Sequence, residues 1–458
     1  MAARQVLVTA AIVSCCTLGA AELRANPPDT YGFGSRETAM GGAMVADVRG
    51  VSANYYNPAA LARSRGLEIS LGYLRAGHHL YMNGLDNHVD PVKGVNGGLV
   101  VPGRLFEIPF AFGIAIHLPD DRISRVRALR QEQPRWELYD NRNQRLFLAA
   151  NLAIEPFPWL WIGGGLSFMS STRGRLDITG GANLFRSDES QLRHEVDADL
   201  TAVRYPQAGM RVALGDRVAL AAAYRGEFQL ALDLSARLYG DVSGLTTALY
   251  ELQTHSINNF LPQQVVVGGA WNVTNHLKAT FDATWIEWSA YKAPVAKLDV
   301  TLDIPPPPSG WPANVQPPSS PAPLRIDTIR MRDRIVPRIG LEYRVLQLRL
   351  LDAFARAGYE MAPSPIESQT GVTNYVDRDR YTFSLGIGAT LKSFAKELPA
   401  GVSLDLHLQW SELREETTLK TNAADFTGDF TAGGRIVNVG FTTTVAFDGP
   451  ARKGEGKK

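Results

Sequence analysis

Cysteine is almost absent from this chain of 458 residues, and its charge is nearly balanced. The only cysteines, Cys15 and Cys16, lie near the N-terminus, so the rest of the chain has no thiol for a disulfide, a zinc cluster or a nucleophile. The formal net charge of +1 and the scattered basic residues give no attraction to nucleic acid. No histidines have metal-ligand spacing, so we expect neither a metal nor a cofactor.

The N-terminal residues have the pattern of a secretion signal. Arg4 supplies the positive charge, an apolar run follows, and the run ends in the small residues Gly19-Ala20-Ala21. We therefore predict a signal peptide at residues 1–21, with Ala25 as the second choice of cleavage site. An alternative interpretation takes Cys15 as the acylated residue of a lipoprotein, although the apolar run continues beyond it.

Long apolar runs are absent beyond this signal. A membrane-spanning helix needs about 20 predominantly apolar residues in succession, and no later segment of the sequence provides them. Hydrophobic residues nevertheless make up 45% of the chain. We therefore expect either a soluble periplasmic protein or a β-barrel.

Alternation of apolar and polar residues distinguishes these two classes. Residues 277–285, 381–391 and 402–411 alternate an apolar side chain with a polar or small one, which places the two kinds on opposite faces of a strand. An even number of such strands, each of about 9 to 11 residues, is typical of bacterial outer-membrane barrels. We count fourteen candidates: 67–76, 92–101, 109–118, 144–155, 159–172, 196–214, 217–238, 262–273, 276–290, 327–345, 348–361, 379–392, 400–413 and 434–447.

The connections between these strands alternate in length. Short turns occur at 155–159, 214–217, 272–276 and 346–347. Barrels of this class have short periplasmic turns and long extracellular loops, an asymmetry that a soluble sandwich has no reason to keep. We therefore predict an all-β fold, a 14-stranded antiparallel transmembrane β-barrel at residues 67–447, followed by a C-terminal tail at 448–458. The long loops are expected near 77–91, 119–143, 173–195, 239–261, 291–326, 362–378 and 414–433.

Two of the long loops have a distinct composition. Residues 304–323 are rich in proline and predict an extended extracellular excursion. Residues 246–260 space Leu249, Leu252 and Ile257 along one side of a short amphipathic helix. This second segment is either a packed loop or an apolar landing surface for a substrate.

The segment before the first strand is rich in glycine and alanine and has no lipid-facing pattern. The residues Gly34, Arg36, Gly41-Gly42-Ala43, Ala46-Asp47 and Asn57-Pro58-Ala59 occur there in this order. They resemble the N-terminal plug of the FadL/TodX family, outer-membrane channels of Gram-negative bacteria that import long-chain fatty acids and other hydrophobic compounds. Later segments are similar to two hairpins of that family. The resemblance implies an N-terminal plug at residues 22–66, inside the barrel lumen.

The resemblance also implies passive uptake of hydrophobic molecules, with long-chain fatty acids as the first candidate, through rearrangement of the plug. Ligands of the family bind near the plug, so the gating role carries over to Gly32-Phe33-Gly34 and Asn57-Pro58-Ala59. Glycine adopts conformations that are forbidden to other residues, which suits a segment that rearranges. The alternative is that the plug glycines only allow tight packing.

Alternation turns several arginines toward the lumen: Arg225, Arg332, Arg334, Arg338 and Arg356. A guanidinium group binds a carboxylate bidentately and keeps its charge. We predict that Arg332, Arg334, Arg338 and Arg356 bind the carboxylate of a ligand. The alternative is that they form salt bridges with acidic residues of the plug or of the lumen.

A kink in an early strand forms a sideways exit to the membrane in the family. Here Pro109 cannot donate a ladder hydrogen bond, and an interior glycine such as Gly113 often marks a bulge. The resemblance therefore implies a lateral opening at these two residues.

Other functions remain as alternatives. The channel could take up aromatic hydrocarbons or other lipids, whereas a general porin would lack so long an N-terminal segment. His407 with Ser403 or Asp405 is the one pair that could act in catalysis, and polar lumen residues are normally only solvated, so we expect no enzyme. We expect a monomer in the cell outer membrane, with a hydrophobic small molecule, outer-membrane lipid and the barrel-assembly machinery as partners and no nucleic acid.

Overall fold

The structure, a computed structural model, describes the following residues: 27–121, 134–139, 146–181, 191–242, 246–291, 297–303, 329–371, 373–392, 400–422 and 425–447. The predicted signal peptide at 1–21, the proline-rich stretch at 304–323 and the tail at 448–458 lie outside these residues.

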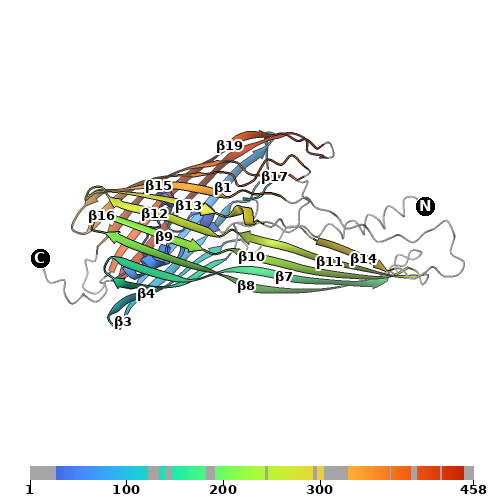
Figure 1. Ribbon diagram of the computed structural model, residues 1–458, viewed down its shortest axis with the longest axis horizontal. Coiled ribbons are helices and arrows are strands. Elements are labelled where there is room, and N and C mark those ends of the chain that lie inside the picture. The colour runs from blue at the N-terminus through green and yellow to red at the C-terminus, as the bar shows by residue number, and fades with distance from the viewer. Residues whose placement is uncertain are drawn as a thin grey trace.

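Fourteen antiparallel strands form a closed barrel, which confirms the predicted fold (Figure 1). Each strand pairs with the next around the barrel, and the first strand pairs with the last, from Glu68 opposite Ala446 to Met82 opposite Ala432. In order, the strands are β1 (Glu68–Met82), β3 (Val92–Leu105), β4 (Ile108–Pro119), β6 (Phe147–Phe157), β7 (Leu160–Gly181), β8 (Gln191–Leu214), β9 (Val218–Arg225), β12 (Gln264–Asn272), β13 (Leu277–Ile286), β15 (Arg334–Gln347), β16 (Leu351–Ala362), β18 (Arg380–Leu391), β19 (Ala400–Thr418) and β20 (Phe430–Phe447).

Three further strands extend the sheet on the side of the long loops. β10 (Phe228–Val242) pairs in parallel with the end of β7, β11 (Thr246–Leu261) pairs with β10, and β14 (Lys297–Asp303) pairs with β11. The short β2 (Leu85–Asp86) folds back on β1, and β5 (Arg135–Trp136) pairs with β17 (Tyr375–Val376).

Three details of the predicted strands and loops are wrong. The loop expected at 173–195 is largely strand, because β7 continues to Gly181 and β8 begins at Gln191. The strand expected at 217–238 consists of two strands, β9 and β10, which Gly226 and Glu227 separate. The segment at 246–260 is not a helix but belongs to β11. Its backbone groups pair with β10 and β14, because extended neighbours on both sides satisfy more hydrogen bonds than a short isolated helix would.

The outer surface of the barrel is apolar, as the alternation predicts. Ile335 of β15 and Leu385 of β18 are about 60% exposed on this surface. The alternate residues of each strand are more buried and point into the lumen. Aromatic residues lie near the short turns, among them Phe157 and Trp159, whose rings stack at 5.5 Å. Such aromatic girdles mark the membrane interface of outer-membrane barrels. We refer to the end with the short turns as the periplasmic end.

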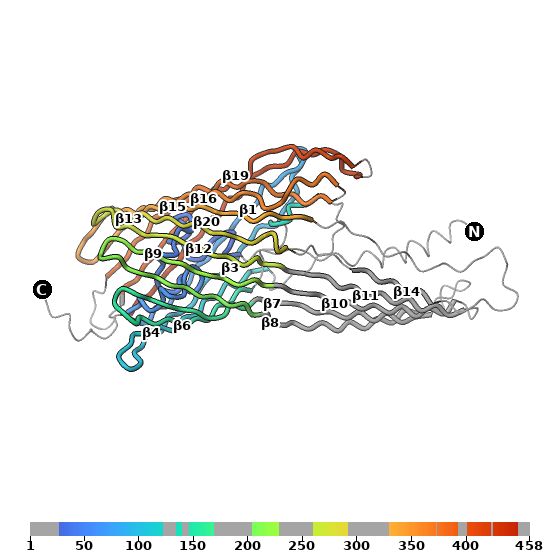
Figure 2. The backbone as a smooth tube through the Cα atoms, in the orientation of Figure 1, coloured from blue at the N-terminus to red at the C-terminus, as the bar shows by residue number. Residues whose placement is uncertain are grey.

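The lumen is filled by residues 27–66, which we call the plug (Figure 2). It consists of short helical turns joined by tight bends, because its many glycines and alanines allow close turns within the narrow lumen. No helix of the described residues is long and apolar enough to cross a membrane. The helical turns are α2 (Pro27–Tyr31), α3 (Ser35–Ala39), η1 (Gly50–Ser52), α4 (Ala53–Tyr56) and η2 (Pro58–Arg63), and η4 (Trp288–Ala290) follows β13.

Glycines of the barrel wall allow the plug to approach the strands closely. A Cβ atom on Gly358 would lie 2.1 Å from the backbone nitrogen of Gly41, and one on Gly163 would lie 2.6 Å from that of Ala59. The plug and the wall are therefore complementary at the level of the backbone. The wall glycines where an added Cβ would press on plug atoms are Gly98, Gly113, Gly163, Gly209, Gly268, Gly340, Gly358 and Gly386.

Candidate functional site

A small cavity lies in the lumen between the plug and the loop that joins β4 to β6. Tyr55 and Tyr56 of the plug line it together with Leu138 and Tyr139 of that loop. Its volume is about 80 Å³, which is less than the cavity of about 150 Å³ that holds one benzene molecule in a protein core. The lumen is therefore closed to a hydrophobic ligand at this point, and passage requires the plug or the loop to move.

Two arginines of the cavity share one glutamate. Nε of Arg338 and Nη2 of Arg380 each lie 2.7 Å from a different carboxylate oxygen of Glu360. All three side chains line the cavity, and Glu360 is largely buried. Glu360 therefore offsets the charge of these two arginines only in part, because one carboxylate faces two guanidinium groups.

Two other arginines of the cavity, Arg225 and Arg334, have no carboxylate within ion-pair distance among the described residues. Arg225 donates to the backbone oxygen of Tyr55 at 3.0 Å and to the side chain of Gln264 at 2.9 Å, with its guanidinium 4.6 Å from the centre of the Tyr55 ring. Arg334 donates to the backbone oxygen of Pro363 at 3.1 Å. Neutral acceptors and ring faces are thus the direct partners of these two charges, and Asp377 and Asp29 act on them only from a longer distance.

Several buried donors around the cavity lack an acceptor among the described residues. They are Nε of Arg225, Arg334 and Arg380, and Nε1 of Trp288, whose ring lies 5.6 Å from the guanidinium of Arg334. Buried polar groups normally have a hydrogen-bond partner, and donors with a positive charge prefer an anionic oxygen. The cavity therefore offers free donors to an oxyanion, and its four arginines outnumber the three carboxylates that line it with them, Asp29, Asp282 and Glu360.

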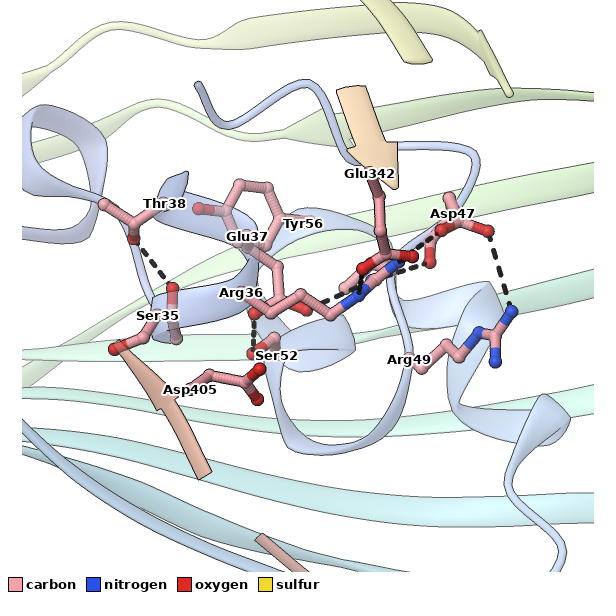
Figure 3. Close-up of polar contacts among 12 residues, drawn as sticks. Ser35, Arg36, Glu37, Thr38, Asp47, Arg49, Ser52, Tyr56, Glu342 and Asp405 are labelled. Atoms are coloured by element: carbon pink, nitrogen blue, oxygen red, sulfur yellow. Dashed lines mark hydrogen bonds and ion pairs between the residues drawn. The ribbon is translucent and has the colours of Figure 1, made fainter. Parts of the chain in front are cut away.

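A second group of charges joins the plug to the barrel wall, and Figure 3 shows Arg36, Asp47 and Glu342 of this group. Arg36 of the plug donates to Glu342 of β15 at 2.9 Å and to Asp47 of the plug at 2.6 Å. Lys278 of β13 lies 2.9 Å from Asp47, and Arg356 of β16 lies 2.7 Å from Glu342. With Asp405, which accepts from Arg356 at 2.6 Å, the group has three cations and three carboxylates. We call it the plug–wall network.

The pKa values of two acidic residues of the plug, Asp47 and Glu37, are shifted in opposite directions. Burial acts to raise the pKa of Asp47, but Lys278 and Arg36 outweigh it and hold that pKa well below its usual value. Burial raises the pKa of Glu37 above its usual value, and Arg36 offsets this effect only in part. Asp47 is therefore a stable anion that ties the plug to the wall.

Comparison with known sequences identifies the family. A sequence model of the family described as outer membrane protein transport protein (OMPP1/FadL/TodX) matches residues 158–445. The chain belongs to this family. The FadL/TodX membership and the closed barrel together place the protein in the outer membrane as a transport protein. No curated protein matches the sequence closely enough to add to this assignment.

Solved structures share the fold of this family member. A FadL homologue of Pseudomonas aeruginosa has a TM-score of 0.52 at 17% identity, with 94% of this chain and 99% of that chain covered. The toluene transporter TbuX of Ralstonia pickettii has a TM-score of 0.51 at 17% identity, with 91% and 99% covered. A mutant of the monoaromatic hydrocarbon channel TodX has a TM-score of 0.51 at 15% identity, with 92% and 100% covered. At these identities the likeness concerns the barrel fold.

Asn57-Pro58-Ala59, predicted to act in gating, connects the plug to β7 and β8 in this FadL/TodX-family chain. The Asn57 amide donates to the backbone oxygens of Val45 at 2.8 Å and Met210 at 3.2 Å. Its side-chain oxygen accepts from the backbone nitrogen of Ala59 at 3.1 Å, which caps the first turn of η2, with Pro58 at the favoured first position. The fully buried Asn57 therefore holds two plug segments and one strand together.

Gly32-Phe33-Gly34 lies near the N-terminus of the plug and contacts the residues just before Asn57. Gly32 and Gly34 have φ angles of +81° and +82°, so a side chain there would be strained. Phe33 packs between Tyr55 and Phe147, with ring centroids 6.4 Å away in both cases. These positive φ angles favour the tight-packing explanation of the two glycines in this closed state, while the gating role stays a prediction.

The structure separates the four arginines that we predicted to act together. Arg334 and Arg338 line the cavity. Arg332 is exposed and donates to the backbone oxygen of Ser364 outside the cavity, and Arg356 belongs to the plug–wall network. Salt bridging, the alternative that we considered, describes Arg338 and Arg356.

Strand β4 is regular at Pro109 and Gly113. It pairs with β3 from Leu105 opposite Ile108 to Gly94 opposite Pro119 and with β6 alongside, without a register shift. The expected kink is therefore not seen in this state. An added Cβ at Gly113 would lie 2.7 Å from side-chain atoms of Asn54 and Leu61 in the plug, so this glycine provides space for the plug.

His407 does not form the catalytic pair that we considered. Its Nδ1 lies 2.9 Å from the hydroxyl of Ser35 in the plug, whereas Asp405 pairs with Arg356 and Ser403 pairs with Thr390. The described residues contain no group of three or more potential metal ligands.

Sequence reasoning missed the residues that close the cavity from the extracellular side. Leu138 and Tyr139 follow the buried Trp136 in the long loop that we expected at 119–143, to which we assigned no role. A signal was available, since Trp136, Leu138 and Tyr139 are large apolar or aromatic residues grouped within a charged loop, and such residues are largely buried on average. Arg380 was missed because it is the first residue of β18, where too few alternating residues precede it to show which way it faces.

Proposed function

We propose that this chain is a channel for the passive uptake of hydrophobic molecules that carry a carboxylate, with long-chain fatty acids as the first candidates. The observation that carries the proposal is the set of four unpartnered donors around the cavity, three of them on arginines. A carboxylate would supply acceptors to these donors and would offset the charges of Arg225 and Arg334. The apolar remainder of the ligand would lie against Leu138, Val336 and their neighbours.

Passage depends on rearrangement of the plug in this proposal. The cavity of about 80 Å³ has no room for an acyl chain. The gating residues are Gly32-Phe33-Gly34 and Asn57-Pro58-Ala59, and of the predicted arginines Arg334 is the one best placed to bind the carboxylate. Exit through the wall at Pro109 and Gly113 would require the pairing of β4 with β3 or β6 to open.

The alternatives are less well supported by the cavity. Two of the structural relatives are described as a toluene transporter and a monoaromatic hydrocarbon channel. A neutral hydrocarbon would leave all four donors unpaired, which is costly in a buried site. A general porin has an open aqueous pore, whereas the plug fills this one. We assign no catalytic role to the chain, and we propose a monomer, because one chain closes the whole barrel.

Uptake of labelled oleate tests the proposal. Cells that lack their own transporter would express the wild type, Arg334→Gln, Asn57→Ala or the control Arg332→Gln, which removes the same charge from an exposed residue outside the cavity. A hydrogen bond to a charged group contributes about 1.5–3 kcal/mol. We therefore expect Arg334→Gln to raise the half-saturating oleate concentration roughly tenfold or more and Arg332→Gln to leave it unchanged.

Two results would count against the proposal. Wild-type oleate uptake by Arg334→Gln would remove this arginine from the site. Uptake of toluene but not of oleate by the wild type, at equal amounts of heat-modifiable barrel on denaturing gels, would favour the aromatic hydrocarbon alternative.

A further inference from the structure

The hairpin of β3 and β4 projects at the periplasmic end of the barrel (Figure 1). Residues 101–105 of β3 pair only with β4 among the described strands, because the ladder between β3 and β1 ends at Val100. Residues 108 and 109 of β4 likewise pair only with β3 there, because the ladder between β4 and β6 ends at Phe110. Residues 101–109 are therefore a two-stranded ribbon without a supporting neighbour on either side. We call it the β3–β4 ribbon.

The outward face of the ribbon is apolar. Leu105 and Ile108 lie opposite each other and are 59% and 43% exposed. The ring of Phe110 lies across Gly103, where an added Cβ would be 2.5 Å from the ring. Phe106 at the tip is 91% exposed. An isolated two-stranded hairpin is at best marginally stable in water, and apolar side chains grouped on one exposed face mark an interaction site.

The turn at the tip contains two strained residues. The φ angles of Phe106 and Glu107 are +48° and +68°. A two-residue hairpin turn with positive φ at both central positions favours Asn-Gly, because other side chains are strained in this region. Backbone strain of this kind is concentrated at functional positions. At this exposure the Phe106 ring adds little to the packing of the chain itself, so it is available to a partner.

The apolar band of β4 reaches the ribbon. The ten residue steps from Ile108 to Leu118, each of about 3.3 Å, span roughly 25 Å of membrane height on a strand tilted by about 40°. This is the height of the apolar band of outer-membrane barrels, about 25 Å. Ile108 therefore lies at the periplasmic boundary of the hydrocarbon, and Phe106 lies at the level of the head groups. The outward residues of β4 are Ile108, Phe110, Phe112, Ile114, Ile116 and Leu118.

The next periplasmic turn has aromatic residues as well. Phe157 and Trp159 stack at 5.5 Å between β6 and β7, and both are about half exposed. Aromatic rings are enriched at the membrane interface because one side is apolar and the other meets water. Phe106 thus extends a girdle that the barrel already has on this side. The exposed Arg104 and Glu107 balance each other in charge, so the apolar face determines the partner.

We propose that the β3–β4 ribbon inserts into the inner leaflet of the outer membrane, with the Phe106 ring among the phospholipid head groups. The partner is a lipid surface, because the apolar face of the ribbon continues the lipid-facing surface of β4 without a break. This role goes beyond the proposed uptake, since it is independent of the molecule that the channel carries.

A fluorophore next to Phe106 tests the position of the tip. An environment-sensitive dye would be attached to Glu107→Cys in the full chain, with Cys15→Ser and Cys16→Ser so that no other cysteine remains. The barrel is placed in vesicles of phosphatidylethanolamine and phosphatidylglycerol. Iodide then quenches dye in water, and a phospholipid with a nitroxide near its head group quenches dye in the leaflet. Asp216→Cys is the control, because Asp216 is an exposed polar residue of the periplasmic β8–β9 turn.

We expect blue-shifted emission of the dye at Glu107→Cys, with strong quenching by the nitroxide lipid and little by iodide, and the reverse at Asp216→Cys. Phe106→Ser should shift the ratio of inserted to water-exposed tips about tenfold toward water, as the loss of one aromatic side chain from lipid predicts. Phe106→Trp should keep the tip in the leaflet, because tryptophan favours the interface. Denaturing gels of unboiled protein would show that each variant forms the barrel.

Equal accessibility of the dye at Glu107→Cys and Asp216→Cys to iodide would overturn the proposal, since the ribbon would then lie in water. Unchanged shielding in Phe106→Ser would overturn it too, because the ring would not be the inserted group. Shielding in fragments of native outer membrane, but not in the lipid vesicles, would replace phospholipid with a protein partner. None of these measurements involves oleate, so their failure would leave the proposed function standing.

Discussion

The contact between Gly358 of β16 and the plug allows the position of the plug to be tested with a single methyl group. In Gly358→Ala, the new Cβ would lie 2.1 Å from the nitrogen of Gly41 and 2.3 Å from the carbonyl carbon of Met40. Both are backbone atoms, so no side-chain rotation relieves the overlap. Overpacking of a well-packed interior costs about 1–3 kcal/mol, and we expect the upper part of this range here.

The plug should move rather than the wall, because ladders on both sides hold β16. A cost of about 2 kcal/mol shifts the ratio of bound to displaced plug roughly thirtyfold. We therefore expect Gly358→Ala to raise single-channel conductance in planar bilayers and the sensitivity of cells to large antibiotics. Denaturing gels of unboiled protein would show that the barrel itself is intact.

Gly77→Ala provides the matched control, since an added Cβ at Gly77 of β1 meets nothing within 4 Å. It should leave conductance at the wild-type level. Equal conductance of Gly358→Ala, Gly77→Ala and the wild type would refute the reasoning, because it would mean that the plug tolerates a methyl group where the structure leaves no space.

Three further predictions concern the plug and the cavity. Lys278 and Arg36 outweigh the effect of burial and hold the pKa of Asp47 below its usual value, so the contribution of Asp47 to plug binding is present above about pH 3.9 and is lost progressively as the pH falls below that value. Conductance should rise over this acid range, and Asp47→Asn should remove that pH dependence. Asn57→Ala should weaken plug binding by about 1–2 kcal/mol through loss of the cap, seen as more frequent opening in bilayers. Glu360→Gln should remove the negative charge that offsets Arg338 and Arg380, so the purified protein should bind oleate more tightly in a titration. Unchanged affinity would disprove a role for the charge of the cavity.

The barrel could be predicted from the sequence because one physical constraint acts on every strand. Lipid on one side and a polar lumen on the other impose alternation, which is visible in single segments such as 402–411. The prediction failed at 246–260, where Leu249, Leu252 and Ile257 have helical spacing, because pairing with β10 and β14 makes this segment a strand and its own residue spacing carries no sign of that pairing.

The site was less accessible from sequence for a related reason. Alternation indicates that Arg334, Arg338 and Arg356 all face inward, but it cannot give the partner of each. The register between strands decides that Glu342 lies opposite Arg356 and that Glu360 lies opposite Arg338. Whether an inward arginine is neutralised or remains available for a ligand therefore depends on pairing, which the sequence pattern leaves open.

The pairing of β1 with β20 has a consequence for the order of assembly. These two strands lie at opposite ends of the chain, so the ladder between them forms only after almost the whole polypeptide has been delivered to the membrane. The plug precedes β1 and contacts strands from both halves of the barrel. The sheet must therefore curl around the plug before its last seam joins, which makes the plug a template for closure as well as an obstacle to flow.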